Sequence, residues 1–377
     1  MPMKTDVALK ACDGYEPSRV KEAVAALIAL MGGIGRFVTR GDSVLLKPNM
    51  LAPASPEKAV TTHPSVVRAV AELVLDAGGR PFIADSPAVP GFAITAKQTG
   101  LGEVAKALGI PIFDLKESIE FKVGEKRIFR MLELSRHALH ADRIINLPKF
   151  KTHSQMYLTA GVKNTFGCVV GTRKAQWHFK AGTDRIFFAR MLVEVYHAVD
   201  PDLTILDSIV AMEGDGPGTG GTPRPIGLLA AATDAVALDR TMLDIAGGDP
   251  DSFFTLRAAA DVGVGETDPA RIRVLGDGAE QFRQRNFNFP KTGKIAVGPK
   301  ALQRFIVNHL TARPVEDRSK CTLCNKCIEI CPTEIISAKD GRLAFNYDKC
   351  IRCFCCVEVC PEGAMKPVTP LLLKIVS

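Results

Sequence analysis

The residues of this chain best suited to chemistry are its cysteines, because nine of the eleven lie between Cys321 and Cys360. Within that stretch the spacing C-x2-C-x2-C-x3-C-P occurs twice, beginning at Cys321 and again at Cys350. Bacterial ferredoxins that bind two [4Fe–4S] clusters have this spacing, and in them the fourth cysteine of each run ligates the other cluster. The spacing therefore predicts two sets of cluster ligands. The first set is Cys321, Cys324, Cys327 and Cys360, and the second set is Cys331, Cys350, Cys353 and Cys356.

Two other uses of clustered cysteines fit this pattern less well. Structural zinc sites usually pair two short ligand elements across a longer gap, whereas here four cysteines fall within eleven residues twice. Disulfides belong to oxidising compartments, and the first residues lack the apolar core of an export signal. Cys355 is surplus to the repeat, and we expect it to be a buried thiol.

The chain before these cysteines, residues 5–275, shows alternating strand and helix patterns. Short apolar runs predict strands at Ser43–Leu46, Pro81–Ala84, Pro111–Leu115, Arg143–Leu147, Leu203–Leu206 and Ile226–Ala232. Apolar residues at helical spacing predict helices at Pro64–Ala77, Thr95–Leu108, Thr183–Val199 and Asp234–Ala246. This alternation predicts a layered α/β fold with a largely parallel sheet, followed by a small α+β ferredoxin-like two-cluster domain.

The domain boundaries follow from changes in this pattern. We expect an α/β body over 1–276, a linker with some helix over 277–319, the ferredoxin domain over 320–366 and a short tail over 367–377. The helix in the linker is expected at Leu302–Leu310. No stretch approaches about 18 uninterrupted apolar residues, so we expect no membrane-spanning helix.

Polar side chains follow several of the predicted strands. In open α/β sheets, ligands bind beyond the carboxyl ends of the strands. If the strands are parallel, these side chains lie along one edge of the sheet and form one cleft. They are Lys47, Asn49, Asp85, Ser86, Lys149, Lys151, His153, Asp207 and Glu213.

A second signal is a bias in charge over 143–183, which contains no Asp or Glu but seven Lys or Arg residues and two histidines. Lysines beside backbone donors at a helix start, as at Lys163 and Asn164, suit a carboxylate or phosphate. A solvated basic face is the alternative. Nucleic acid stacked on Tyr157 and Trp177 is a third, and the modest formal charge of +7 makes it the weakest.

Two local features have more than one interpretation. The glycine-rich segment Glu213–Gly221 opens no helix, so it is not a dinucleotide-binding turn and is either a lid over a site or a wide turn. His63 stands before a proline at a predicted helix start. It either reaches into the cleft or caps the helix.

Several short motifs, in a fixed order along the chain, resemble the iron–sulfur proteins grouped as domain of unknown function 362. The motifs are Lys47-Pro48-Asn49, Thr62-His63-Pro64, Asp85-Ser86-Pro87, Leu147–His153, Gly161–Asn164 and Glu213–Pro217. The resemblance covers residues 5–275, and a fused two-cluster ferredoxin tail is common in that family. It implies this architecture and a cytoplasmic redox setting, but neither a substrate nor a catalytic role.

The first functional hypothesis is a cytoplasmic redox enzyme that passes electrons through two [4Fe–4S] clusters to a small anionic substrate. The residues expected to hold the anion or to contact a cofactor are Lys47, Asn49, Lys149, Lys151, His153, Lys163 and Asn164. Protons would come from Asp85, Asp207 or Glu213, which could instead bind a metal.

The second hypothesis is an electron-transfer or maturation protein without its own substrate. In that case the basic segment 143–183 docks an acidic redox partner. A third is that the clusters are structural or sensing elements. In the first two hypotheses the expected electron partner is a ferredoxin or a reductase, with no membrane span.

Overall fold

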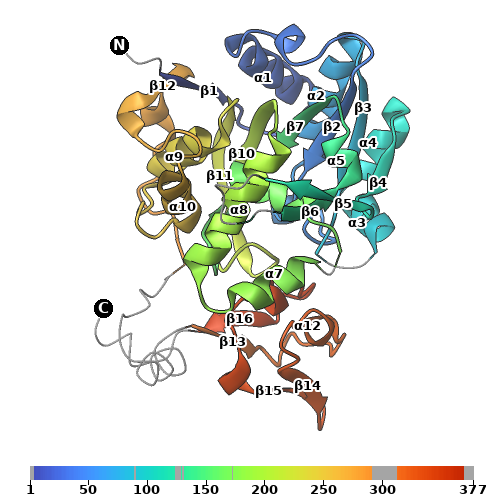
Figure 1. Ribbon diagram of the computed structural model, residues 1–377, viewed down its shortest axis with the longest axis vertical. Helices are drawn as coiled ribbons and strands as arrows, with labels where there is room; N and C mark the ends of the chain where they lie inside the picture. The colour runs from blue at the N-terminus through green and yellow to red at the C-terminus, as the bar shows by residue number, and fades with distance from the viewer. Residues whose placement is uncertain are drawn as a thin grey trace.

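The computed structural model describes residues 4–88, 91–123, 129, 131–171, 173–290 and 312–368. Figure 1 shows them in two units. A large body around a central sheet is formed by residues up to 290, and a smaller C-terminal module is formed by residues 312–368. The module lies against one end of the body, next to the helix labelled α7 (Arg173–Ala181).

The body is built on a ten-stranded mixed sheet. The strand order is β12-β1-β11-β10-β7-β2-β3-β4. Neighbouring strands in this order are parallel, except that β11 is antiparallel to both β1 and β10. β8 pairs with β10 and β9, and β5–β6 form a separate antiparallel pair. The strands are β1 (Thr5–Ala11), β2 (Ser43–Pro48), β3 (Arg80–Asp85), β4 (Ile112–Asp114), β5 (Ser118–Lys122), β6 (Met131–Ser135), β7 (Arg143–Leu147), β8 (Lys149–His153), β9 (Tyr157–Thr159), β10 (Leu203–Gly214), β11 (Gly221–Ala232) and β12 (Ile272–Gly276).

Helices cover both faces of this sheet, so that alternate strand residues enter two different cores. Leu45 packs into one core, while its neighbours Val44 and Leu46 pack into the other. Helices α1, α2 and α4 cover the Val44 face, and α8, α9 and α10 cover the Leu45 face (Figure 1). This double cover explains why the central strands are almost continuously apolar. The helices of the body are α1 (Pro17–Leu30), α2 (Pro64–Asp76), α3 (Phe92–Gln98), α4 (Leu101–Leu108), α5 (Arg136–Leu139), α6 (Gly161–Asn164), α7, α8 (Arg185–Val199), α9 (Ala235–Ala246) and α10 (Phe254–Val262).

The C-terminal module repeats a short helix followed by a strand. α12 (Lys326–Glu329) precedes β14 (Ile336–Lys339), and α13 (Cys355–Glu358) precedes β16 (Met365–Val368). β16 pairs with β13 (Arg313–Glu316), and β14 pairs with β15 (Arg342–Phe345), both antiparallel. Because β13 belongs to the module, the module begins before the predicted boundary at 320.

The predicted α/β fold with a largely parallel sheet is confirmed, with three local corrections. The predicted helix Thr95–Leu108 is two helices, because Gly100 adopts a left-handed conformation with φ of 74° between α3 and α4. The first strand, β1, was not predicted. Part of the expected linker belongs to the body, since Phe282 and Phe287 are buried in its core. The predicted helix Leu302–Leu310 and most of the predicted tail lie outside the described residues.

Candidate functional site

The four cysteines of the first predicted set surround one small cavity in the module. Burial and the neighbouring Cys360, Cys324 and Cys321 together raise the pKa of the Cys327 thiol to about 11. Cys360 comes from the other half of the repeat and nevertheless lies among the first three. This arrangement is the one that the ferredoxin spacing predicts.

The second predicted set is grouped in the same way. Burial raises the pKa of the Cys356 thiol well above its ordinary value, and Cys353, Cys350 and Cys331 raise it further. Among the described residues, no three His, Cys, Asp or Glu side chains are arranged around a single ion. The four thiolates of a cubane bind four different iron atoms and lie farther apart than the ligands of one ion. Each group of four thiols is a donor set that fits a cubane cluster.

The carboxyl ends of β2, β3, β7 and β10 lie at the same edge of the sheet, because these strands are parallel neighbours. The chain leaves β2 toward β3 and later returns to β7 on the other side of β2, so the strand order reverses between β2 and β7. Open α/β sheets bind ligands at such a point. Here Asn164 Nδ2 donates to Asn146 Oδ1 at 2.8 Å, and Asn49 Nδ2 donates to Asn164 Oδ1 at 3.0 Å.

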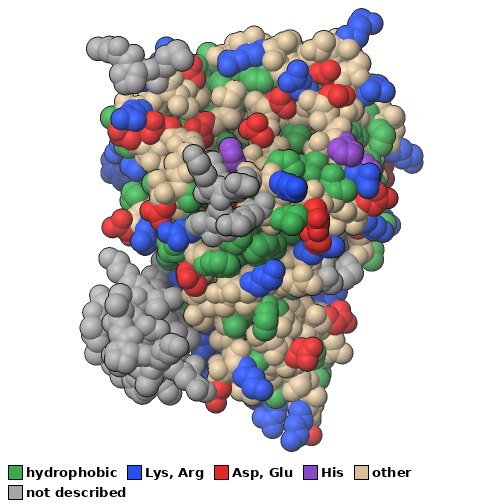
Figure 2. Space-filling model, viewed as in Figure 1, with side chains coloured by type: hydrophobic (Ala, Val, Ile, Leu, Met, Phe, Trp, Pro, Cys, Tyr) green, Lys and Arg blue, Asp and Glu red, His purple; other side chains and the backbone are tan. Residues whose placement is uncertain are grey.

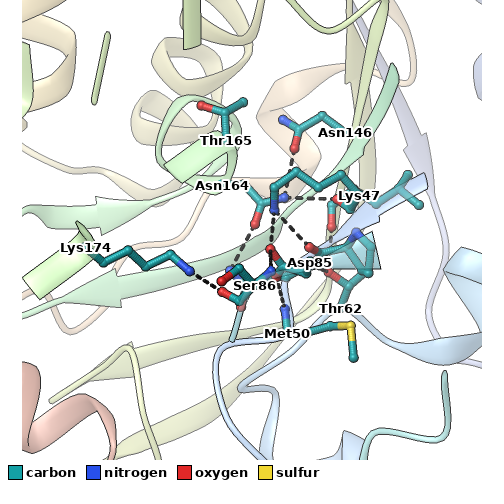
Figure 3. A network of polar contacts seen from close by, with 12 residues as sticks. Lys47, Met50, Thr62, Asp85, Ser86, Asn146, Asn164, Thr165 and Lys174 are labelled. Carbon is teal, nitrogen blue, oxygen red and sulfur yellow. Dashed lines mark hydrogen bonds and ion pairs between the residues drawn. The ribbon is translucent and has the colours of Figure 1, made fainter. Parts of the chain in front are cut away.

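Lys47 is buried and neutralised within the body, as Figure 3 shows. Its Nζ lies 2.9 Å from Asp85 Oδ1, and the other oxygen of Asp85 accepts from the Met50 backbone N–H at 2.8 Å. Gly167 packs directly on this pair, since a Cβ there would overlap the Asp85 carboxylate and lie 2.5 Å from Lys47 Nζ. The Lys47 charge is therefore matched inside the protein.

Lys149 is neutralised in the same way by Asp207. Their Nζ and Oδ2 atoms are 2.8 Å apart, and Tyr15, whose hydroxyl contacts both, closes the group. His63 stacks on the Tyr15 ring at 3.6 Å and caps α2 by accepting from the Ser65 N–H. Burial lowers the pKa of His63 to about 4. His63 therefore caps helix α2. Tyr15 was not among the predicted site residues, because no motif in the sequence indicated it.

Lys151 and His153 are also buried, and they contact different segments of the chain. Lys151 Nζ donates to Asn49 Oδ1 at 2.8 Å and to the Val60 carbonyl. His153 Nε2 lies 3.0 Å from Glu358 Oε1 of the C-terminal module. Burial lowers the pKa of His153 to about 4. His153 thus joins the body to the module.

Two predicted features do not contribute to a site. The start of α6, expected to bind an anion, is filled by the Asp239 carboxylate, which accepts from the Gly161 and Val162 N–H groups at 2.6 and 3.1 Å. Glu213 lies away from the other predicted acids, because it accepts from the Asn288 N–H at 3.0 Å and faces Arg224 at 3.8 Å. The backbone donors at this helix start are therefore already occupied by a carboxylate of the protein itself.

The glycine-rich segment Glu213–Gly221 joins β10 to β11 and contacts the module. Thr219 Oγ1 donates to the Cys360 carbonyl at 2.7 Å. A Cβ at Gly218 would lie 2.7 Å from the Glu358 carbonyl oxygen, so only glycine allows this close approach. The segment is thus a turn that docks the module.

A cavity of about 480 Å³ lies between the body and the module. Its wall includes residues of β3, α6, η3 (Thr165–Cys168) and α7 on one side and of α12 and α13 on the other. The polar and sulfur-bearing side chains in this wall are Asn49, Asp85, Ser86, Asp114, Lys116, Thr159, Lys163, Asn164, Lys174, His178, Lys326, Glu329, Cys331, Cys355 and Glu358. Of the predicted cleft residues, Asn49, Asp85 and Ser86 line it, as do Lys163 and Asn164, which were predicted at the helix start; the other cleft residues do not.

Besides Glu358 Oε1, which faces His153, two buried side chains in this wall have a polar atom without a hydrogen-bond partner among the described residues. They are His178, whose Nδ1 is unpartnered, and Thr159, whose Oγ1 is unpartnered. The His178 ring stacks on Phe188 at 4.2 Å, and burial lowers its pKa to about 3. His178 and Thr159 both lie in the acid-free segment that the sequence singled out, but only the histidine was counted among its notable residues.

The basic segment 143–183 is largely interior. Lys149 and Lys151 are each 1% exposed, and burial lowers the pKa of Lys174 to about 8. Tyr157 is buried against Phe289 and is not available to stack a base. On the face drawn in Figure 2, basic and acidic side chains are interspersed over the body. The segment is therefore not a solvated basic face.

The sequence of the chain matches two domain families. It matches Domain of unknown function (DUF362) over residues 44–244 and the 4Fe-4S dicluster domain over residues 313–361. It is also 44% identical over 269 residues to the thylakoid-associated protein sll1697 of Synechocystis sp. (strain ATCC 27184 / PCC 6803 / Kazusa). This match covers 70% of this chain and 82% of that relative. The chain belongs to the DUF362 family.

In this DUF362 protein the family match covers the strands whose ends carry the buried ion pairs, and the second match covers the C-terminal module. The module is thus a ferredoxin-like [4Fe–4S]-binding domain. The lactate racemase apoprotein from Thermoanaerobacterium thermosaccharolyticum matches 63% of the chain with a TM-score of 0.40 and 12% identity, and this chain covers 56% of it. Within the described residues, every helix is too short or too polar to cross a membrane.

Proposed function

We propose that this DUF362 protein is an iron–sulfur redox protein that passes electrons through two [4Fe–4S] clusters to a small anionic substrate. The substrate would bind in the cavity between body and module. One observation carries the proposal: the cavity has Cys331 of the second thiol set on one side and Lys163 and His178 on the other. A ligand there would contact the body and lie beside the cluster-binding residues.

The eight repeat cysteines would each bind one iron atom, in the two sets given above. Bound clusters of this type supply single electrons at potentials set by charge, hydrogen bonds and exposure. The protein would contribute the surroundings of the reaction. Cys355, which is 6% exposed and also lines the cavity, would remain a thiol.

Lys163 and Lys174 are the groups that best suit an anion. Both line the cavity, and within the described residues neither forms an ion pair with a carboxylate. Lys174 Nζ instead donates to the Ser86 carbonyl. A partly desolvated ammonium group that forms no direct ion pair attracts a carboxylate or phosphate more strongly than one in water. This differs from the prediction, in which Lys47, Lys149 and Lys151 also held the anion.

Proton supply would involve groups of the cavity wall. Of the three predicted acids, only Asp85 lines the cavity, and its Oδ1 is already paired with Lys47 Nζ at 2.9 Å. Thr159 Oγ1 and His178 Nδ1 have no hydrogen-bond partner among the described residues, so both can form a hydrogen bond with a ligand. They would orient the substrate while protons arrive with it or through Lys163.

The alternative, an electron-transfer or maturation protein without its own substrate, has less support. It needs the basic segment to dock an acidic partner, but Lys149 and Lys151 in that segment are buried. The proposal keeps a ferredoxin or reductase as the electron partner. It also keeps a cytoplasmic location, because nine closely spaced thiols need a reducing environment.

The proposal can be tested on the anaerobically reconstituted full chain. About eight iron atoms per chain are expected, four for each cluster. The reduced protein is then titrated with small carboxylates and with inorganic phosphate, following both binding and reoxidation. Lys163→Met should weaken binding about tenfold or more, because it removes the unpaired charge.

Lys180→Met is the matched control, since Lys180 is an exposed lysine of the same segment. It should leave binding unchanged. If no carboxylate or phosphate binds, or if both variants behave alike, the substrate part of the proposal is wrong. An iron content near four would overturn the second cluster alone.

A further inference from the structure

The cavity between the body and the module is larger than a simple anion requires. Its volume is about 480 Å³, and cavities of about 300–1,000 Å³ commonly bind organic molecules of the size of a drug. Acetate or inorganic phosphate would fill only a small part of this space. The size of the cavity therefore suits a ligand that has a body as well as a charged group.

More of the cavity wall is apolar than polar, and both units contribute to its apolar part. Across the contact between the units, Leu51 of the body and Ile330 of the module pack in the same apolar cluster as Val359. Apolar ligand surface that leaves water for such a wall gains free energy. The apolar residues of the wall include Leu51, Phe92, Leu115 and Phe166 of the body and Ile330 and Val359 of the module.

A gap that holds only water is the competing interpretation of this cavity. A buried water typically makes about three hydrogen bonds, so ordered water needs polar groups around it. The charged side chains of the wall can order water near themselves, but Phe92, Leu115 and Phe166 offer it no partner. The apolar part of the wall therefore suits an apolar group better than it suits water.

The charged side chains of the wall leave one positive charge in excess. Among the described residues of the wall, four are lysines and four are aspartates or glutamates. Asp85 is already paired at 2.9 Å with Lys47, which is not part of the wall. Three carboxylates therefore remain for four lysines. A monocarboxylate would balance this excess, whereas a phosphate monoester carries about 1.5 to 2 negative charges at neutral pH.

From the size, the apolar surface and the charge of this cavity we infer that its ligand is a monocarboxylate with an apolar chain or ring. The carboxylate would be held by the lysines of the wall, and the apolar part would lie against Leu51, Phe92 and Val359. This inference rests on the proposed function, because it names the class of anion that the cavity binds. It concerns binding alone, so no bond forms or breaks.

The test measures the affinity of straight-chain carboxylates for the reconstituted full chain by titration calorimetry. Acetate, butyrate, hexanoate and octanoate carry the same charge and differ only in the length of the apolar chain. Each added methylene group should tighten binding about fourfold, which corresponds to about 0.8 kcal/mol per buried CH2. Equal affinities for acetate and octanoate would overturn this inference and leave the proposed function intact.

Two further ligands test the acid group. Hexanol has the same chain length as hexanoate but no charge, and it should bind about tenfold more weakly or worse. Equal binding of hexanol and hexanoate would overturn the proposed function, because the cavity would not recognise an anion, and this inference with it. Hexyl phosphate carries the larger charge. Tighter binding of hexyl phosphate than of hexanoate would overturn the assignment of a carboxylate.

Variants of α7 locate the apolar chain in the cavity. Ala175 lines the cavity, so Ala175→Phe should fill part of it and weaken octanoate binding about tenfold, with a smaller effect on acetate. Gln176→Phe is the matched control, because Gln176 is an exposed residue of the same helix. It should leave the binding of both ligands unchanged.

A second pair of variants on α3 serves if Ala175→Phe does not fold. Phe92→Ala removes apolar wall surface and should weaken octanoate binding about fivefold. Ile94→Ala is its control, since Ile94 is 58% exposed on the same helix. Octanoate that binds equally well to each variant and its control would lie elsewhere on the protein, and this inference would be overturned.

Discussion

The body and the C-terminal module are stabilised in different ways. The body has two extensive apolar cores, one on each face of its sheet. The module has one small core, and three of its ten buried members are predicted cluster ligands, Cys327, Cys356 and Cys360. A domain of this size buries too little apolar surface to be robust without a metal or cross-links. The difference indicates that the body folds independently of iron, whereas folding of the module is coupled to cluster binding.

A second contrast lies within the body. Lys47 and Lys149 are each paired with an aspartate at 2.9 and 2.8 Å, whereas Lys163 and Lys174 line the cavity. A buried charge with its partner stabilises little but is costly to unpair. The first two lysines therefore hold the strand ends in place, and the other two remain available to a ligand.

Removal of iron should have the largest effect and should separate the two units. We expect the apo protein, or a Cys356→Ser variant, to lose the fold of the module, because the ligands form much of its core. The body should keep its structure. Hydrogen exchange of holo and apo protein measures this by region. Equal protection of the module in both forms would contradict the contrast.

Unpairing a buried lysine should have the next largest effect. Asp85→Asn leaves the Lys47 ammonium without a countercharge and should lower the free energy of unfolding by about 3–5 kcal/mol. Asp261→Asn breaks the exposed pair with Arg190 at 3.2 Å and should cost less than about 1 kcal/mol. Urea unfolding of both holo variants compares them. Similar losses in the free energy of unfolding for the two variants would show that unpairing the buried Lys47 costs no more than breaking the exposed pair.

Mild acid should destabilise the body through its buried histidines. The pKa values of His63, His153 and His178 are lowered to about 4, 4 and 3 from an ordinary 6.5, with burial as the main cause. As pH falls from about 6.5 to about 4, the unfolded chain binds protons that the folded chain does not. Each ring should therefore contribute a loss of up to about 2 kcal/mol near pH 5.

Urea unfolding at several pH values measures this loss. His178→Phe should reduce the dependence on pH, because the ring lies among Phe166 and Phe188 and an apolar replacement fits there. A pH dependence as steep as that of the wild type would show that His178 is protonated in the folded protein.

The contact between the units should show the smallest effect. Thr219→Val removes the hydrogen bond to the Cys360 carbonyl and should weaken docking by about 1 kcal/mol. Faster hydrogen exchange at the contact surface, with unchanged exchange in the core of the body, would report this. Thr222→Val, at an exposed position of the same hairpin, should have no effect. If both variants exchange alike, the turn does not dock the module.

The sequence predicted the fold class because strand and helix patterns are local. Strands such as Arg143–Leu147 and Leu203–Leu206 are covered on both faces of the sheet, so their residues are mostly apolar. Such runs can be recognised in the sequence without knowledge of the fold. It missed β1, which pairs with β11 and β12 from distant parts of the chain. It merged α3 and α4, since the left-handed conformation of Gly100 leaves the apolar periodicity intact.

The candidate site was predicted only in part. The position of Asn49, Asp85 and Ser86 at the strand ends followed from parallel strands, and all three line the cavity. The availability of each lysine did not follow, because ion pairing depends on which aspartate the fold brings close. Glu358 was not predicted. It lies between two cysteines of the repeat, and its contact with His153 forms only where the module packs on the body.

By itself, the sequence determined the cysteine repeat and the layered α/β pattern, because spacing and periodicity are properties of short segments. Only the tertiary structure decided that Lys149 is neutralised by Asp207, that His153 joins the body to the module and that a cavity lies beside Cys331. The physical reason is that burial and charge pairing depend on the distance between segments far apart in the chain. That distance is set when the sheet, its helices and the module pack together.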